Sequence, residues 1–393
     1  MKRRDLVKML FLLTAGLMLP VRWVFGRTVS PVAVKATSGK EALASAKVVQ
    51  IRHDNVCDWD YGEGDYTDSI HLAAVKKMLE AGLVELTGAS TVGEAWAALI
   101  QPYRAGDKIL LKPNMNNPRI GYAQAIMTSP QLIVAVVESL LTAGYPACDI
   151  IIYDLTADGR QPVTRRLSSL GVSCVFLDEN KNLWGKIATR LALGPDAPDT
   201  SAPIHLQKPV RDDGGNDVTC YIPKVLTQAA HLINLPVLKA HQFVLQSSAL
   251  KNHFGTVRFS NFNSYPVVLH GQDIDWHIAD INANPHIKNK TRLTVVDAIF
   301  GAACFTRGNH GRTPTPWKTW PGGDTPKSLF FSCDPLAVES VLADFVRQEQ
   351  SFLGYEAYSD HYLKIASALG LGIYERRSPE GHYSRIDFIK RIL

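Results

Sequence analysis

Lysine, histidine and asparagine side chains gather in one short stretch of the chain, directly after an apolar run that predicts a buried strand. Lys239 and His241 end this run, and Lys251, Asn252 and His253 follow it closely. Histidine transfers protons near neutral pH, lysine binds anions or carbonyl oxygens, and ligand sites of open α/β folds lie where strands end. We therefore predict His241, His253 and Lys251 as catalytic residues. Lys239 and Asn252 are predicted to bind the substrate.

The spacing within this stretch adds a geometric expectation. Lys239 and His241 are separated by one residue, as are Lys251 and His253, and on an extended chain such pairs face the same way. A lone histidine is more often a structural residue, whereas several such groups together favour a ligand site. The motifs H-E-x-x-H, G-x-S-x-G and the P-loop do not occur in the sequence, so no known metalloprotease, hydrolase or nucleotide site is indicated.

Two more candidate substrate-binding residues, Lys112 and Asn114, follow another short apolar run. A lysine that ends a buried strand presents its ammonium at the carboxyl edge of the sheet, and an asparagine hydrogen-bonds in the loop beyond it. The alternative is a surface lysine beside a turn.

Asp154, Asp297 and His277 are the candidate metal ligands. Both aspartates follow predicted strands, and His277 belongs to a polar group within residues 270–277. Carboxylate oxygen and imidazole nitrogen bind divalent metals, so a metal is a possible cofactor, although the cofactor is unknown from sequence. The alternatives are helix capping for the aspartates and the polar first turn of a helix for residues 270–277. For Asp334, which precedes a proline, we predict a helix cap.

The cysteines argue against two kinds of cofactor site. The six cysteines are widely spaced and form no C-x-x-C pair, so neither a zinc ribbon nor an iron–sulfur cluster is expected. A domain of this size does not need disulfides, and none is predicted.

The apolar patterns alternate between strands and helices. Predicted strands cover residues 47–53, 108–112, 149–153, 230–235, 293–296 and 328–332, and predicted helices cover 69–81, 91–100, 128–141, 275–281 and 334–346. These intervals predict an α/β fold with mostly parallel sheets flanked by helices, built from repeated βαβ units. Two parts are expected, an N-terminal α/β part at 46–205 and a C-terminal α/β part at 206–393 that carries the Lys/His stretch. Trp317 and Trp320 lie in a Pro- and Gly-rich segment that either covers the site or packs locally.

The first residues predict export. A basic start with paired Arg3 and Arg4 precedes an apolar stretch at 9–19, as in a twin-arginine signal peptide over residues 1–26, followed by a linker at 27–45. This segment implies a bacterial periplasm or cell envelope, the twin-arginine machinery as a partner and no stable membrane span after processing. The alternative is a basic start to a buried first helix. Most of the formal net charge of +5 lies in this segment, so nucleic-acid binding is not expected.

Several of these segments together resemble one bacterial and archaeal family. They are residues 111–114, 128–130, 233–241, 249–255, 293–298 and 332–337. The chain resembles the domain of unknown function 362 family, and in particular its twin-arginine-exported members without the ferredoxin-like cluster domain, whose cysteine motif is absent here. The resemblance implies no settled activity.

Two functions remain open from the sequence. The first is an exported enzyme that acts on a small anionic or carbonyl-bearing substrate with a Lys/His/Asn site at strand ends. The alternative is a non-enzymatic periplasmic protein that binds a metal, a cofactor or a small anion.

Overall fold

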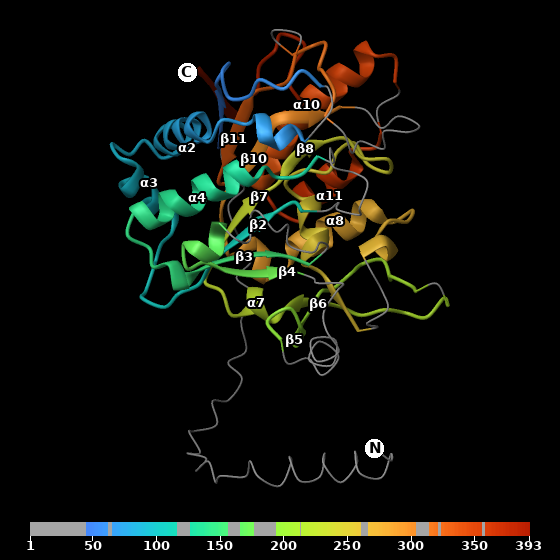
Figure 1. The fold of residues 1–393 in the computed structure, drawn as a ribbon. Coiled ribbons are helices and arrows are strands. Elements are labelled where there is room, and N and C mark those ends of the chain that lie inside the picture. The colour runs from blue at the N-terminus through green and yellow to red at the C-terminus, as the bar shows by residue number, and fades with distance from the viewer. Residues whose placement is uncertain are drawn as a thin grey trace, which may run out of the picture. The chain divides into compact units, whose positions relative to one another are not determined.

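A computed structural model gives the fold (Figure 1). It describes residues 45–61, 65–115, 126–155, 166–176, 194–212, 214–260, 266–303, 314–320, 324–355 and 358–393. The predicted signal peptide at 1–26 and residues 27–44 of the predicted linker lie outside this part. Residues 41–393 form one compact unit.

A large, mostly parallel sheet runs through this unit in the order β12-β1-β11-β10-β7-β2-β3-β4, with β8 paired to β10. Its strands are β1 (Ala46–Arg52), β2 (Ile109–Pro113), β3 (Ile150–Asp154), β4 (Ser173–Phe176), β7 (His231–Leu235), β8 (Val237–Lys239), β10 (Thr291–Ala302), β11 (Ser328–Ser332) and β12 (Ile386–Ile392). Of these strands only β11 runs antiparallel to its neighbours, β1 and β10. The predicted α/β fold with a mostly parallel sheet is confirmed.

Helices cover both faces of the sheet, as Figure 1 shows. One layer holds α2 (Leu72–Thr87), α3 (Val92–Leu99) and α4 (Pro130–Thr142); the other holds α8 (Ile274–Ala283), α10 (Pro335–Phe352) and α11 (His361–Ala368). Shorter elements are α7 (Lys224–Thr227), α9 (Pro285–Lys288) and the 3-10 helices η1 (Tyr66–Ser69), η2 (Ala147–Asp149), η3 (Lys251–Thr256) and η4 (Pro266–Leu269). A small sheet joins β5 (Pro198–Pro203), β6 (Cys220–Pro223) and β9 (Arg258–Phe259).

Alternation along the strands produces two cores. In β2, Leu110 belongs to the core beneath α8, α10 and α11, whereas Ile109 and Leu111 belong to the core beneath α2, α3 and α4. Successive strand residues point to opposite faces, and a parallel sheet buried on both faces needs apolar residues on each. Strands from the two predicted parts, 46–205 and 206–393, share this one sheet. The division between those parts stays a prediction.

Side-chain caps fix the helices that follow two strands. Asp334 accepts hydrogen bonds from the backbone N–H groups of Leu336 and Ala337, both at 2.9 Å, so the predicted cap of α10 is confirmed. Ser129 caps α4 ahead of Pro130 in the same way. Among the described residues, no helix is long and apolar enough to span a membrane. The described cysteines are all free, and Cys304 lies outside the described residues.

Candidate functional site

Two groups of polar residues lie where the parallel strands end. The first, which we call the inner cluster, consists of Lys112, Asp154, Asn234 and Asn252. Lys112 and Asn234 are register partners in β2 and β7, so their side chains stand on the same face of the sheet. Asp154 ends the neighbouring strand β3, and Asn252 reaches this face from η3.

Hydrogen bonds close the inner cluster upon itself. The Lys112 ammonium has no solvent exposure and donates to Asp154 Oδ2 at 3.0 Å and to the Pro113 carbonyl at 2.8 Å. The Asn252 amide donates to the Lys112 carbonyl at 2.9 Å and to Asn234 Oδ1 at 2.7 Å. Burial lowers the pKa of Lys112, and the Asp154 charge opposes that shift. A lysine held in this way serves as the centre of a buried network.

Gly255 explains how η3 approaches the ion pair so closely. A Cβ atom at this position would lie 2.8 Å from Asp154 Oδ1 and 2.9 Å from Lys112 Nζ. The Gly255 carbonyl also accepts a hydrogen bond from the backbone of Leu155 at 3.0 Å. The absence of a side chain at Gly255 therefore lets the backbone of η3 pack directly against the ion pair of the inner cluster.

His253 also lies on the inner side. It is 1% exposed, and its Nδ1 is 3.2 Å from Thr256 Oγ1, which in turn is 3.1 Å from the Tyr153 hydroxyl. Burial, and then the Lys112 charge, lower the pKa of His253 to about 3. The ring is therefore neutral near pH 7.

The second group, which we call the outer cluster, consists of Lys239, His241, Lys251, Phe254 and His270. Lys251 Nζ lies 2.9 Å from His270 Nε2 and 4.5 Å from the centre of the Phe254 ring. The rings of His241 and His270 are stacked, with centroids 5.3 Å apart. Lys251 is buried at 4% exposure, whereas both histidines are partly exposed.

The expectation that Lys251 and His253 face the same way is wrong. Both lie in η3, which is a 3-10 helix and not an extended segment. With about three residues per turn, positions i and i+2 diverge around the axis. Lys251 therefore joins the outer cluster, and Asn252 and His253 turn inward.

Electrostatics favour uncharged groups in the outer cluster. Burial, and then the nearby Lys239 charge, lower the pKa of Lys251 to about 7. Burial, followed by the charges of Lys251, His270 and Lys239, lowers the pKa of His241 well below its ordinary range. Among the described residues, no carboxylate pairs with Lys251. Within these described residues, the outer cluster therefore holds a buried amine without a carboxylate counterion.

Lys239 and Asn114 reach the same edge of the sheet. Lys239 ends β8 and donates to the Ile126 carbonyl at 3.3 Å. The backbone N–H of Asn114 donates to Thr128 Oγ1 at 2.8 Å, which fixes the loop after β2. The Lys239 charge acts on both Lys251 and His241, so the structure brings Lys239 into the outer cluster.

The structure does not bring the candidate metal ligands together. Asp297 accepts hydrogen bonds from the Ser129 backbone at 2.7 Å and the Ser129 hydroxyl at 2.6 Å, and burial raises its pKa. Asp154 pairs with Lys112, and both His277 ring nitrogens face backbone carbonyls, at 3.1 and 3.2 Å. Within the described ranges, no group of three or more His, Cys, Asp or Glu side chains could hold a metal ion.

The polar group at 270–277 is interpreted from the sequence either as metal ligands or as the polar first turn of a helix, and its members behave differently. Asp275 accepts a hydrogen bond from the Tyr362 backbone at 2.8 Å and ties α8 to α11, as expected for a polar first turn. His270, which the sequence grouped only with possible metal ligands, is the hydrogen-bond partner of Lys251.

Sequence reasoning missed Glu339. This side chain on α10 is fully buried and accepts from the Leu250 backbone at 3.2 Å and the Tyr362 hydroxyl at 2.8 Å. Burial raises its pKa to about 7. The available signal is a carboxylate within an otherwise apolar helix face. Glu339 fixes the backbone that leads directly into Lys251.

Trp317 and Trp320 pack locally and do not contact the outer cluster in any described interaction. Both are buried, and the Trp320 ring lies 4.3 Å from Phe345. Glu349 on α10 holds the segment between them through the backbone N–H groups of Lys318 and Thr319, at 2.6 and 2.7 Å.

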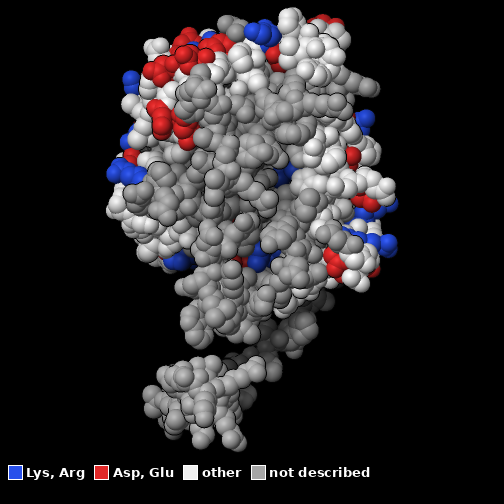
Figure 2. Space-filling model, turned by 45° about the vertical axis from the view of Figure 1, so that its right-hand side comes forward, with Lys and Arg blue, Asp and Glu red and all other residues white. Residues whose placement is uncertain are grey.

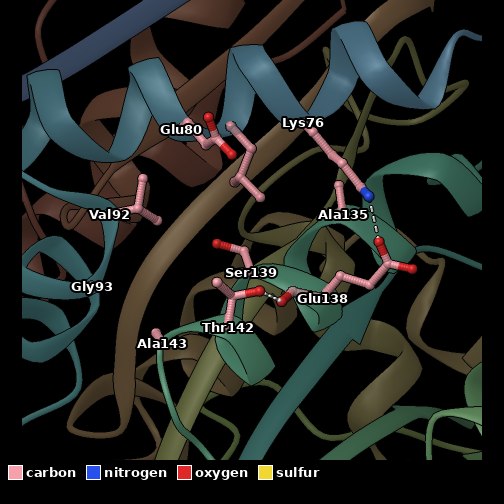
Figure 3. A pocket seen from close by; sticks show the side chains of 10 residues that line it. Lys76, Glu80, Val92, Gly93, Ala135, Glu138, Ser139, Thr142 and Ala143 are labelled. Atoms are coloured by element: carbon pink, nitrogen blue, oxygen red, sulfur yellow. Dashed lines mark hydrogen bonds and ion pairs between the residues drawn. The ribbon is translucent and has the colours of Figure 1, made fainter.

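A separate hollow of about 230 Å³ lies between α2, α3 and α4 (Figure 3). Lys76 and Glu138 form an ion pair of 2.5 Å across it, and Ser139 Oγ accepts from the Trp96 indole at 2.8 Å. Its lining belongs to the helical layer on the opposite face of the sheet from Phe254. An ion pair and a side-chain hydrogen bond occupy Lys76, Glu138 and Ser139, so we do not place the site there.

Surface charge in one view is mixed. Figure 2 shows acidic side chains gathered at the upper edge and basic side chains in small separate groups. On this face, the described residues form no continuous basic surface.

One comparison with known proteins gives a match. A family model described as "Domain of unknown function (DUF362)" matches residues 109–344. The matched range contains Lys112, both clusters and Glu339. No curated relative matches the chain.

Proposed function

The chain belongs to the domain of unknown function 362 family, and because that description assigns no activity, we propose a function from the outer cluster itself. We propose an enzyme that acts on a small anionic or carbonyl-bearing substrate. Lys251 is the reactive group, His270 exchanges protons with it, and Lys239 attracts the negative charge of the substrate. His241 lines the entrance of the substrate.

The observation that carries this proposal is the 2.9 Å contact between the buried Lys251 Nζ and His270 Nε2, with no carboxylate paired to Lys251 in the part of the chain that the structure describes. A buried cation without a counterion costs stability, so a scaffold gains nothing from it. A lysine that loses its proton near neutral pH serves as a base or a nucleophile, and such residues concentrate at functional sites. This supports an enzyme over a structural protein.

Ligand-induced stabilisation tests the proposal. Small carboxylates, 2-oxo acids and phosphates are added to the wild type and to Lys251→Met, and the melting temperature is measured. A compound that binds the folded state at about 100 times its Kd stabilises it by about 2.7 kcal/mol. We expect at least one compound to stabilise the wild type and not the variant. The control is Lys77→Met, at an exposed position on α2, which should respond like the wild type.

If no compound in the set distinguishes Lys251→Met from the wild type, the outer cluster is not a binding site for these substrates. The proposed function would then be withdrawn.

The second candidate is a protein that binds a metal, a cofactor or a small anion. The neighbouring rings of His241 and His270 favour it, since imidazole nitrogen is a good metal ligand. Metal analysis of protein recovered from its native host decides between the two. Stoichiometric metal that is lost in His270→Gln supports the second candidate; metal content that is unchanged by this variant supports the first.

We further propose export by the twin-arginine route to the periplasm or cell envelope. The support is the basic and apolar layout of residues 1–26, which lie outside the described residues. Arg3→Lys with Arg4→Lys should leave the protein in the cytoplasm when cell fractions are compared. Periplasmic recovery of this double variant would contradict the proposal.

A further inference from the structure

We propose that Lys251 forms a covalent iminium with the carbonyl carbon of a 2-oxo carboxylate, whose carboxylate group is attracted by the charge of Lys239. This inference rests on the proposed function and narrows it to one substrate class and one covalent step. It is carried by the placement of the amine, the proton acceptor beside it and the second cation.

The amine is placed as a carbonyl nucleophile requires. Lys251 Nζ has His270 Nε2 as its hydrogen-bond partner, and the Phe254 ring lies 4.5 Å away on another side. Phe254 and His270 meet edge to face, with ring centroids 5.1 Å apart. Burial of Lys251 against these rings excludes water and disfavours the ammonium, and only the neutral amine has a lone pair for attack.

The second cation selects the substrate class. Lys239 ends β8 two residues before His241, and the His241 ring stacks on His270, the partner of Lys251. The Lys239 charge lowers the pKa of both Lys251 and His241. A 2-oxo acid carries a carboxylate directly beside its carbonyl group. Its negative charge would therefore rest near Lys239 when its carbonyl carbon meets Lys251, whereas a simple ketone would gain nothing from this charge.

The step balances with the groups present and one proton from the solvent. The Lys251 lone pair attacks the carbonyl carbon, the C=O π electrons move to oxygen, and that oxygen takes up a proton from the solvent to give a carbinolamine. His270 Nε2, at 2.9 Å, accepts the proton that the nitrogen releases. Return of that proton to the hydroxyl group expels water, and the nitrogen lone pair forms the C=N bond. The products are one iminium and one water, and no oxidant or reductant takes part.

The inner cluster provides an internal comparison for this chemistry. Lys112 is equally buried, but it is ion-paired with Asp154 and donates to the Pro113 carbonyl. Its nitrogen is held as a hydrogen-bond donor to these two oxygens, and the Asp154 carboxylate opposes the loss of its proton. The proposal therefore assigns covalent reaction to Lys251 and none to Lys112.

Borohydride trapping tests the inference in the full-length folded protein. Pyruvate and 2-oxoglutarate are the probes, acetone is the carboxylate-free control, and the modified lysine is located by peptide mass spectrometry. Hydride reduction of an iminium gives a stable secondary amine. We expect one reduced adduct per chain, on Lys251, with either 2-oxo acid and dependent on borohydride. Lys251→Arg should abolish it.

A second variant tests the role of Lys239 without removing the amine. Lys239→Gln should lower the yield at limiting pyruvate by roughly tenfold, which corresponds to about 1.4 kcal/mol of substrate binding. The slow reaction with acetone should change much less. An equal loss with both probes would mean that Lys239 acts on the amine and not on the carboxylate.

Absence of an adduct on Lys251 of the folded wild type, or labelling spread equally over surface lysines, overturns the iminium. If 2-oxo acids still stabilise the wild type and not Lys251→Met, the proposed enzyme stands and only the covalent step fails. If no compound stabilises the wild type either, the proposed function fails as well.

Discussion

Lys112 and Lys251 are two buried lysines in one protein, and their surroundings differ in the charge of the nearest partner. Lys112 lies 3.0 Å from the Asp154 carboxylate, whereas Lys251 lies 2.9 Å from the His270 imidazole, which carries no negative charge. Burial lowers the pKa of both. For Lys112 the aspartate opposes this effect without cancelling it; for Lys251 the Lys239 charge adds to it.

The difference separates a lysine that stabilises from one that reacts. A buried ion pair with satisfied hydrogen bonds is tolerated in a core, whereas an unpaired buried ammonium neutralises by losing its proton. The inner cluster closes the sheet edge beneath η3, and the outer cluster keeps a neutral amine near a partly exposed surface. These two buried lysines therefore cannot be given one common role.

Removal of the counterion in the inner cluster should have the largest effect. Asp154→Asn leaves Lys112 buried and unpaired, and we expect a loss of about 3–5 kcal/mol in the free energy of unfolding. Denaturant unfolding measures it. The control is Asp54→Asn, which breaks an exposed pair with Arg52 and should cost less than about 0.5 kcal/mol. Equal losses of unfolding free energy in the two variants would contradict the claim that the buried pair matters more than the exposed one.

A smaller loss should follow from crowding the same ion pair. Gly255→Ala places a methyl group 2.8 Å from Asp154 Oδ1, and we expect a loss of about 1–3 kcal/mol from this overpacking. Gly93→Ala is the matched control, because a Cβ at that position on α3 meets nothing within 4 Å. It should stabilise the helix by about 0.5–1 kcal/mol. A neutral Gly255→Ala would show that η3 does not close tightly over Lys112.

Replacement of the outer lysine should change stability in the opposite direction. Lys251 has a pKa of about 7 when folded and 10.5 ordinarily, so the unfolded chain binds more protons between these values. Wild-type stability therefore rises with pH across this window. Lys251→Met should be more stable by about 2 kcal/mol below pH 7, with the gain shrinking toward pH 10.5. Thermal unfolding at several pH values measures this gain. A destabilised variant would show that the charge of Lys251 is compensated by a partner in the folded protein.

The smallest effect should come from Glu339, which positions Lys251 through the Leu250 backbone. Its pKa is raised from 4.5 to about 7, so the folded state binds the proton more tightly and its stability falls as pH rises through this window. Glu339→Gln mimics the protonated form. Its free energy of unfolding should match that of the wild type near pH 5 and exceed it by about 1 kcal/mol at pH 8. The gain stays this small because the amide has one acceptor oxygen for the two donors, the Leu250 backbone and the Tyr362 hydroxyl.

A pH-independent difference between Glu339→Gln and the wild type would contradict the raised pKa. A positioning role is tested separately by borohydride trapping with pyruvate. Glu339→Gln should lower the trapping rate and leave the modified residue unchanged.

The sequence was sufficient for the fold and for the strand ends. Apolar runs such as the one before Lys112 are local signals, and their alternation with helices indicated a parallel sheet. The positions of Lys112, Asp154 and Lys239 at strand ends followed from the same pattern. The cap at Asp334 was predictable because the proline after it marks the first helical turn.

The assignment of roles within the site was beyond the sequence. The partner of Lys112 depends on the register of β2 against β3 and on the return of η3, and both are tertiary features. The 3-10 geometry of η3 separated Lys251 from His253. His270 and Glu339 come from distant segments, so no spacing rule links either of them to Lys251.

The protonation state of Lys251 tests the central claim most directly. Nuclear magnetic resonance follows the Cε shift of each labelled lysine as a function of pH, and Lys251→Arg assigns the signal. The account predicts a Lys251 midpoint near 7, far below the ordinary value of 10.5. A Lys251 signal that titrates at the ordinary value would contradict it, since the amine would then be charged at neutral pH and the contrast with Lys112 would disappear.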